Sequence, residues 1–229
     1  MSTSFTVRVA ELARELRAAP DPATTLQSIV DACVQLFPEC AGAGITLADK
    51  NGEVRTSATS SELHAQLDEL EKEMGEGPCL DSVWQEKAIL VHDLSSEQRW
   101  TRLAPRAVET FGIRSMVCVQ LYTAAGPLGS LSLSSREAGA FTESDIEEVM
   151  ALGAHAAAAI AASENISHLE GALQSRTMIG QATGLVMAKY GLDSEAAFKV
   201  ILRLSSEQNR KVAVLAREMV DDWDRTKEL

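Results

Sequence analysis

The sequence predicts an α+β protein in which an antiparallel sheet flanked by helices is followed by a long helix and a bundle of three short helices. Three observations support this prediction. Two pairs of apolar or β-branched runs are each joined by a turn signal, helical patterns lie between these pairs, and the last third of the chain shows only three- and four-residue apolar spacing. The length of 229 residues and the 45% hydrophobic content are typical of one or two globular domains.

The chain opens with two helical patterns. Residues 5–18 and 24–37 place apolar side chains three and four positions apart, and two prolines separate the two stretches. We assign the first stretch to an N-terminal segment, 1–20, and the second to a sheet domain that covers residues 21–163.

Two hairpins form the framework of the predicted sheet. The runs 41–49 and 53–60 flank an Asn51-Gly52 pair, which is typical of a type I′ turn. The runs 114–124 and 127–136 meet at a Gly-Pro turn. Further segments lie between the hairpins, with helical patterns at 60–74, 79–86 and 102–112 and an extended pattern at 88–94.

A long helix is predicted over residues 142–173. Its second half repeats apolar residues at the spacing of a coiled-coil seam, over barely two heptads. Two interpretations remain open here, one helix lying on the sheet or a parallel dimer seam. The candidate seam residues are Ala159, Ala162, Ile166, Leu169 and Leu173.

The last fifty residues form three helical patterns, 174–190, 194–208 and 210–223, with Gly191 ending the first and Asp193 and Asn209 as candidate N-caps of the next two. One face of each pattern is apolar, and Trp223 is placed on the inner face of the third. Such a small bundle has little core alone, so we expect it to depend on the preceding helix and on a partner.

Charge distinguishes this tail from the rest of the chain. The protein has 21 basic and 33 acidic residues and a net charge of −12, which disfavours phosphate binding on average. Residues 176–217 differ, because seven basic residues against three acidic residues give a local charge of +4. This stretch is compatible with a phosphate-binding surface.

The tail resembles the ANTAR domain, an RNA-binding antiterminator module, over about residues 165–225. Two positions depart from the commoner ANTAR pattern, with Thr183 in place of a Lys and Leu202 in place of an Arg. The resemblance rests on residues 175–187 (SRTMIGQATGLVM), Tyr190-Gly191, residues 195–198 (EAAF), residues 203–206 (RLSS), residues 209–211 (NRK), and Val212 with Ala216.

The ANTAR resemblance implies contacts with hairpin loops, in which cations hold phosphates and polar groups meet base edges. The implied RNA-binding residues are Arg176, Gln181, Thr183, Lys189, Lys199, Arg203, Ser205, Ser206, Asn209, Arg210 and Lys211. Binding of DNA through a helix-turn-helix is the weaker alternative, because the overall charge opposes it.

The sheet domain resembles a GAF domain, of the kind fused to ANTAR in actinobacterial regulators. GAF domains cup small molecules between sheet and loops, so the resemblance implies a sensor with an unidentified small-molecule ligand. The matching residues are 75–81 (GEGPCLD), Asp93-Leu94, Arg99-Trp100, 112–115 (GIRS), 126–131 (GPLGSL) and 140–142 (AFT).

Together, the two resemblances imply a homodimeric transcription antitermination regulator that binds paired small hairpins in nascent leader RNA. The competing hypotheses are a GAF-fold thiol reductase that uses Cys79 or Cys118, with a helical tail that only dimerises, and a sensor whose tail contacts protein. Cys79 is the candidate redox residue, because it begins a helix whose dipole would lower its thiol pKa. Structural packing is the alternative role for Cys79.

The sequence lacks the patterns of several other classes. Its four cysteines and four histidines show no metal-ligand spacing or catalytic triad, and no phosphate-binding glycine loop occurs. We therefore expect no catalytic site, no metal and no cofactor. No uninterrupted apolar run is long enough to span a membrane and the start does not resemble a signal peptide, so we expect a cytoplasmic protein with reduced thiols.

Overall fold

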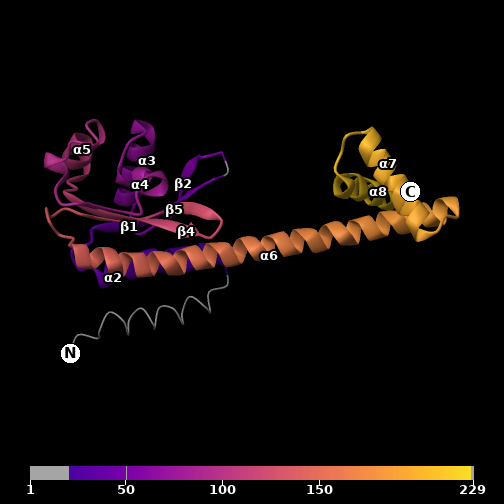
Figure 1. Cartoon of the computed structure of the whole chain (residues 1–229), viewed down its shortest axis with the longest axis horizontal. Coiled ribbons are helices and arrows are strands. Elements are labelled where there is room, and N and C mark those ends of the chain that lie inside the picture. Colours follow the sequence, from indigo (N-terminus) through magenta and orange to yellow (C-terminus); the bar gives the residue numbers. More distant parts are fainter. Residues whose placement is uncertain (1–20, 50, 228–229) are drawn as a thin grey trace, which may run out of the picture. The chain divides into compact units, whose positions relative to one another are not determined.

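The computed structural model describes residues 21–49 and 51–227 (Figure 1). Residue contacts divide the chain into two compact units, Met1–Ser163 and Glu164–Leu229. The helix predicted over residues 5–18 lies outside the described residues.

Unit 1 is built on a five-stranded antiparallel sheet with the strand order β2-β1-β5-β4-β3. Both predicted hairpins are present, and the predicted fold class is confirmed. The strands are β1 (Gly42–Ala48), β2 (Val54–Thr59), β3 (Ala88–Val91), β4 (Ser115–Thr123) and β5 (Gly126–Ser135). The predicted turns were wrong, because Gly126 and Pro127 lie inside β5 and the chain turns at 124–125. The Gly52 N–H donates to the Asp49 carbonyl, so Gly52 closes its turn and is not a central residue of a type I′ turn.

The alternation of leucine and serine in β5 gives the sheet two different faces. Successive side chains of a strand point to opposite faces. Leu131 and Leu133 therefore lie in one apolar cluster, whereas Ser130, Ser132 and Ser134 are buried on the other face. One side of the sheet is thus apolar and the other presents a row of buried hydroxyls.

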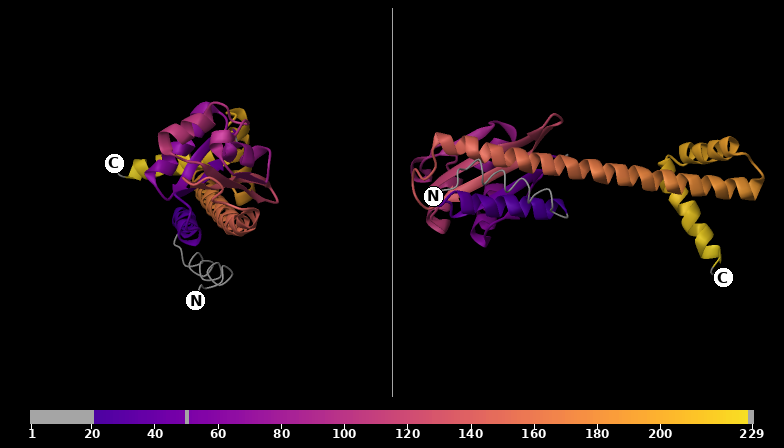
Figure 2. Two further views of the ribbon diagram at one scale, coloured as in Figure 1. Left: turned by 90° about the vertical axis from the view of Figure 1, so that its left-hand side faces the viewer. Right: turned by 90° about the horizontal axis from the view of Figure 1, so that it is seen from below.

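Two long helices cover the apolar face (Figures 1 and 2). The first, α2 (Pro22–Leu36), begins at Asp21, whose side chain accepts a hydrogen bond from the Thr24 N–H. The second, α6 (Glu143–Tyr190), contributes Val149, Leu152 and Ala156 to the same cluster. This packing explains the apolar composition of the first part of α6.

Shorter helices cover the polar face. They are α3 (Glu62–Met74), α4 (Pro78–Trp84), the single turn η1 (Leu94–Ser96), α5 (Leu103–Arg106) and the π-helical segment η2 (Ala107–Phe111). In Figure 1 these helices lie on the opposite side of the sheet from α2 and α6. A second apolar cluster, which includes Leu67, Trp100 and Met116, lies beneath them.

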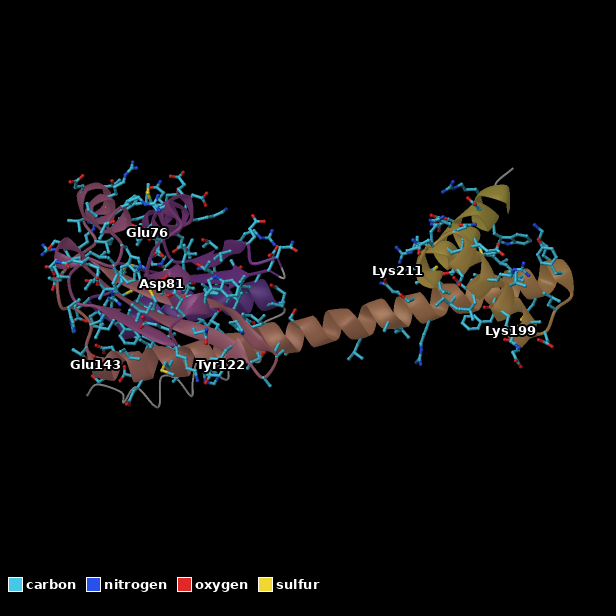
Figure 3. All side chains as sticks on the ribbon, turned by 45° about the horizontal axis from the view of Figure 1, so that its top comes forward. Glu76, Asp81, Tyr122, Glu143, Lys199 and Lys211 are labelled. Carbon is cyan, nitrogen blue, oxygen red and sulfur yellow. The ribbon has the colours of Figure 1, made fainter. Side chains whose placement is uncertain are left out.

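Polar residues of the GEGPCLD motif fasten this second layer (Figure 3). Glu76 accepts hydrogen bonds from the N–H groups of Arg102 and Leu103 at 2.6 and 3.0 Å, which satisfies the start of α5. Asp81 accepts the indole N–H of Trp100 at 2.8 Å. These acids therefore hold the scaffold of the domain.

Unit 2 contains the last part of α6 together with α7 (Ser194–Glu207) and α8 (Val212–Lys227). The structure differs here from the separate helices predicted at 142–173 and 174–190, because α6 is continuous from Glu143 to Tyr190. The expected burial of Trp223 was wrong, since 41% of this residue is exposed. The core of the unit consists of Ala182, Val186, Ala197, Ile201, Leu215, Ala216 and Val220.

Candidate functional site

The residues predicted to contact RNA lie on three segments of unit 2, namely the end of α6, the helix α7 and the connection between α7 and α8. In Figure 3, Lys199 of α7 and Lys211 of the connection lie on separate parts of the unit. Most of the predicted residues are exposed: Arg176, Gln181, Lys189, Lys199, Arg203, Ser206, Asn209 and Lys211.

The connection between α7 and α8 is a tight, hydrogen-bonded turn. Asn209 adopts a left-handed conformation, with φ of 51°, and its N–H donates to the Ser206 carbonyl. Asn209 therefore ends α7, and its predicted role as the N-cap of α8 was wrong, because α8 begins only at Val212. The turn holds Arg210 and Lys211 in a defined place at the end of the bundle.

Three of the predicted cations make surface ion pairs within the unit. Lys199 pairs with Glu195 at 2.6 Å and Arg203 with Glu207 at 2.8 Å, while Arg210 pairs with Glu218. Such exposed pairs contribute little to stability. The phosphates of a polyanion can therefore replace the carboxylate partners of these cations with little loss of folding free energy.

Lys189 and Lys211 are in different surroundings from these paired cations. Lys189 Nζ lies 5.5 Å from the ring centroid of Tyr190. Lys211 is exposed, and within the described residues no carboxylate lies within ion-pair distance of it. Lys211 is the cation of the turn that is most accessible to a phosphate.

Two predicted contacts are buried. Thr183 donates to the Ile179 carbonyl at 2.7 Å, and Ser205 donates to the Arg210 carbonyl; both are less than a tenth exposed. These hydroxyls have roles inside the unit, so the interface proposed below does not include them.

The predicted seam residues lie on one continuous helix. Leu169 and Leu173 are 71% and 67% exposed. Ala159 is half-buried and Ala162 exposed, whereas the side chain of Ile166 lies outside the described part of the structure. Two exposed leucines four residues apart lie on the same face of α6 and offer apolar surface there.

Sequence reasoning missed a buried polar cluster in unit 1. His64, Asp68 and Glu71 lie at positions i, i+4 and i+7 of α3 and point toward the hydroxyl face of the sheet. The two ring nitrogens of His64 each lie 2.9 Å from a hydroxyl, of Ser134 and of Ser132. Burial lowers the His64 pKa to about 4, so this imidazole is neutral at pH 7.

The two carboxyl groups of the cluster are buried with few partners. Asp68 Oδ2 accepts from the Thr56 hydroxyl at 2.9 Å, and Glu71 Oε2 accepts from the Cys79 N–H at 3.0 Å. Burial raises the Asp68 pKa to about 7, and burial together with nearby Asp68 raises the Glu71 pKa to about 8. Both groups therefore retain protons far above the usual range for carboxylic acids.

The predicted activation of Cys79 was wrong. Its Sγ lies 3.7 Å from that of Cys118 and the residue is buried. The neighbouring Cys118 and burial raise the Cys79 pKa well above its ordinary value, and Glu71 already occupies the N–H at the start of α4. A buried thiol with a raised pKa favours the packing role over the redox role.

We expect the native protein to react very slowly with a thiol reagent such as DTNB, because all four cysteines are buried and only the thiolate is nucleophilic. Absorbance at neutral pH measures the reaction, and urea should release four equivalents. Rapid modification of Cys79 in the native protein, lost in Cys79→Ser, would contradict its assignment to packing.

Comparison with known families agrees with this arrangement. Residues 19–161 match the family model of the GAF domain, and residues 167–220 match that of the ANTAR domain. The chain belongs to the GAF–ANTAR regulators. Its ANTAR domain, which contains α7, α8 and the end of α6, is of an RNA-binding type, and its GAF domain is of a sensory type. Both are regulatory domains.

Solved structures show the same fold for the GAF domain. Three similar structures are the GAF domains of phosphoenolpyruvate-protein phosphotransferases from Acinetobacter and Coxiella burnetii and the free methionine-R-sulfoxide reductase of Neisseria meningitidis. In the order named, the sequence identities are 15, 19 and 16%, and the TM-scores are 0.58, 0.59 and 0.59. The matches cover 73, 72 and 72% of this chain and 99, 96 and 96% of the other chains. At these identities the likeness concerns the fold alone. No functionally curated protein matches the sequence.

Two further features of the GAF–ANTAR chain concern metal binding and membrane spanning. Among the residues that the structure describes, no group of three or more His, Cys, Asp or Glu side chains is placed to hold a metal ion. The segment Glu143–Ser163 of α6 is long and apolar enough to cross a membrane by length and composition. A third of this segment is buried, and Val149, Leu152 and Ala156 are among the residues that pack on the sheet.

Proposed function

We propose that this GAF–ANTAR protein is a cytoplasmic, non-enzymatic regulator that binds paired RNA hairpins as a dimer and prevents formation of a transcription terminator. The observation that carries the proposal is the turn between α7 and α8, where Arg210 and Lys211 follow a fixed left-handed Asn209 inside the ANTAR match. Arg203 and Ser206 on α7 and Gln181 on α6 extend the proposed surface.

Electrostatics favour the ANTAR domain over the GAF domain as the RNA-binding part. Most of the net charge of −12 lies before residue 164, whereas residues 176–217 have a local charge of +4. RNA phosphates gain from neutralisation by Lys and Arg because condensed counterions are released. The surface ion pairs of Arg203 and Arg210 keep these cations in place until phosphate replaces their carboxylate partners.

The main test of the proposal is the exchange of single charges at the turn. Lys211→Ala is expected to weaken binding of a two-hairpin RNA about 10-fold and to lower the slope of log K against log salt by about 1, because one phosphate contact is lost. Glu207→Gln should strengthen binding, since it releases Arg203 from its carboxylate partner. Electrophoretic titration at several salt concentrations measures both effects.

A matched control removes a cation from the GAF domain. Arg55 is exposed on β2, and Arg55→Ala makes the same charge change as Lys211→Ala outside the proposed interface. Equal losses in the two variants would show that only net charge matters, and the proposed interface would be wrong. Circular dichroism confirms that each variant is folded.

Dimerisation fits both the target and the helix. Two linked ANTAR domains that engage two hairpins gain affinity through effective concentration, without any new contact. The exposed Leu169 and Leu173 of α6 supply the apolar surface for such a pairing.

A further inference from the structure

Three buried oxygen atoms of the GAF domain lack a hydrogen-bond partner among the described residues. They are Thr46 Oγ1, Asp68 Oδ1 and Glu71 Oε1. All three side chains are more than nine-tenths buried. The Thr46 hydroxyl interacts with the Asp68 carboxyl, and His64 Nε2 lies 3.6 Å from Asp68 Oδ1, just beyond hydrogen-bond distance. Buried polar atoms without a protein partner are rare in folded proteins and are usually met by an ordered water or a small ion.

The residues that carry these atoms line one small cavity. Its volume is about 20 Å³, and its lining includes Thr46, Asp68, Glu71 and Cys79. This space holds a single water-sized guest. Glu69 and Lys72, which are exposed, form the outer part of the lining, so the cavity reaches the surface of α3.

The charge of the cavity defines the guest. Two carboxyl groups lie there, and the nearest base is His64, whose Nε2 lies 3.6 Å from Asp68 Oδ1. Burial lowers the His64 pKa to about 4, so it supplies no cation at pH 8, and the Lys72 ammonium pairs with Glu69 at 3.8 Å on the surface. A buried carboxylate without a counter-charge is costly. The pair is therefore stable as neutral acids, or as carboxylates around a positively charged guest.

The acceptor set favours an N–H donor over a metal ion. Three oxygen atoms are fewer than the six to eight ligands that Ca²⁺ takes, and no metal-holding group occurs among the described residues. An ammonium group is all donor, has the size of a water molecule, and can donate to all three atoms. We propose that the cavity between α3, β1 and β2 binds a cationic ammonium group, either the free ion or the head of a small primary amine.

Binding in the cavity also affects the neighbouring helix α4, because Glu71 contacts both. The Glu71 side chain lines the cavity, and its Oε2 accepts from the Cys79 N–H at the start of α4. A guest that ionises Glu71 strengthens this hydrogen bond, because the carboxylate is the better acceptor. Binding therefore couples the cavity to the packing of α3 and α4, and it displaces protons from the acids. This inference specifies the input of the proposed sensor and does not depend on RNA binding.

The test is a thermal melt of the full chain at pH 8 with ammonium chloride, methylammonium chloride, sodium chloride or potassium chloride at equal ionic strength. We expect the ammonium salts to raise Tm by about 2–4 °C more than the metal salts when the ion is at roughly ten times its Kd. The shift should be smaller at pH 6, where the acids hold their protons. A larger shift with methylammonium assigns the site to a primary amine, and a larger shift with ammonium assigns it to the free ion.

Variants locate the effect. Glu71→Gln and Asp68→Asn keep shape and hydrogen bonding but remove the charge, and should abolish the specific shift. Glu73→Gln removes an exposed charge from the same helix and should leave it intact. Equal shifts with all four salts, or an ammonium shift that persists in Glu71→Gln, would overturn the proposal. RNA affinity is measured separately, so a failure here leaves the RNA-binding proposal standing.

Discussion

Asp68→Asn and Glu71→Gln are each expected to make the GAF domain more stable than the wild type at pH 8, on the order of 3 kcal/mol. Most substitutions of buried residues destabilise. These two differ because the wild-type groups are acids with folded pKa values of about 7 and about 8, against ordinary values of 3.8 and 4.5.

The sign follows from proton binding. Between about pH 4 and pH 8 the folded state holds more protons on these two groups than the unfolded state does, so the free energy of unfolding falls as the pH rises. The stabilisation that these bound protons give to the folded state is fully present below the unfolded pKa values. It is lost as the pH rises through the folded pKa values. Each amide variant removes one of the two titrating groups and leaves the other, so its stability should fall less steeply than that of the wild type over the same range.

Urea unfolding at several pH values between 5 and 8.5 measures this effect, with Glu73→Gln as the control. The hydrogen bond with Arg99 lowers the pKa of Glu97 to about 2. This acid therefore titrates below the pH range of the experiment and does not interfere. A wild-type stability that does not fall with pH, or variants that fall equally, would show that the carboxyl pair is hydrated.

The fold of the GAF domain was predictable because its signals are local. Two-residue alternation and nearby glycines such as Gly52 indicate strands and hairpins without knowledge of the rest of the chain, although the exact turn residues differ from those predicted. The end of the long helix was less predictable. A change of apolar pattern near Leu173 suggested a boundary, but no proline or cap follows it, and the backbone continues as a helix to Tyr190.

The buried polar cluster was missed because its residues resemble a solvated helix surface. Residues 60–74 are polar and rich in Glu, and only the spacing of His64, Asp68 and Glu71 places them on one face. A signal was available in β5, where Ser130, Ser132 and Ser134 alternate with leucines and require polar partners on their face of the sheet.

Cys79 illustrates a different limit of sequence reasoning. The start of a helix lowers a thiol pKa only if the thiol can use the helix N–H groups and has no opposing neighbours. Here Glu71 accepts the Cys79 N–H and Cys118 contacts the sulfur from β4. Neither contact can be deduced from the local sequence, because both depend on how distant elements pack.

The second large effect is expected at the proposed dimer seam. Replacing both Leu169 and Leu173 by Glu should convert a dimer into a monomer and weaken binding to a two-hairpin RNA at least about 100-fold, because avidity is lost. The leucines are 71% and 67% exposed in the single chain, so the change does not disturb its core. In the dimer the same change places like charges opposite each other in an apolar seam.

Gly171→Glu is the matched control, since position 171 faces away from the two leucines on the helix and a Cβ there meets nothing within 4 Å. Sedimentation at micromolar concentration measures the assembly, and titration with one-hairpin and two-hairpin RNAs measures the avidity. The seam variant should lose much less affinity for the single hairpin, because that RNA engages one ANTAR domain. A wild type that is monomeric, or a Leu169/Leu173 variant that stays dimeric, would place the contact between protomers away from this part of α6. An equal loss on both RNAs would instead show that the leucines act within one RNA-binding unit, because a loss of avidity requires two linked sites.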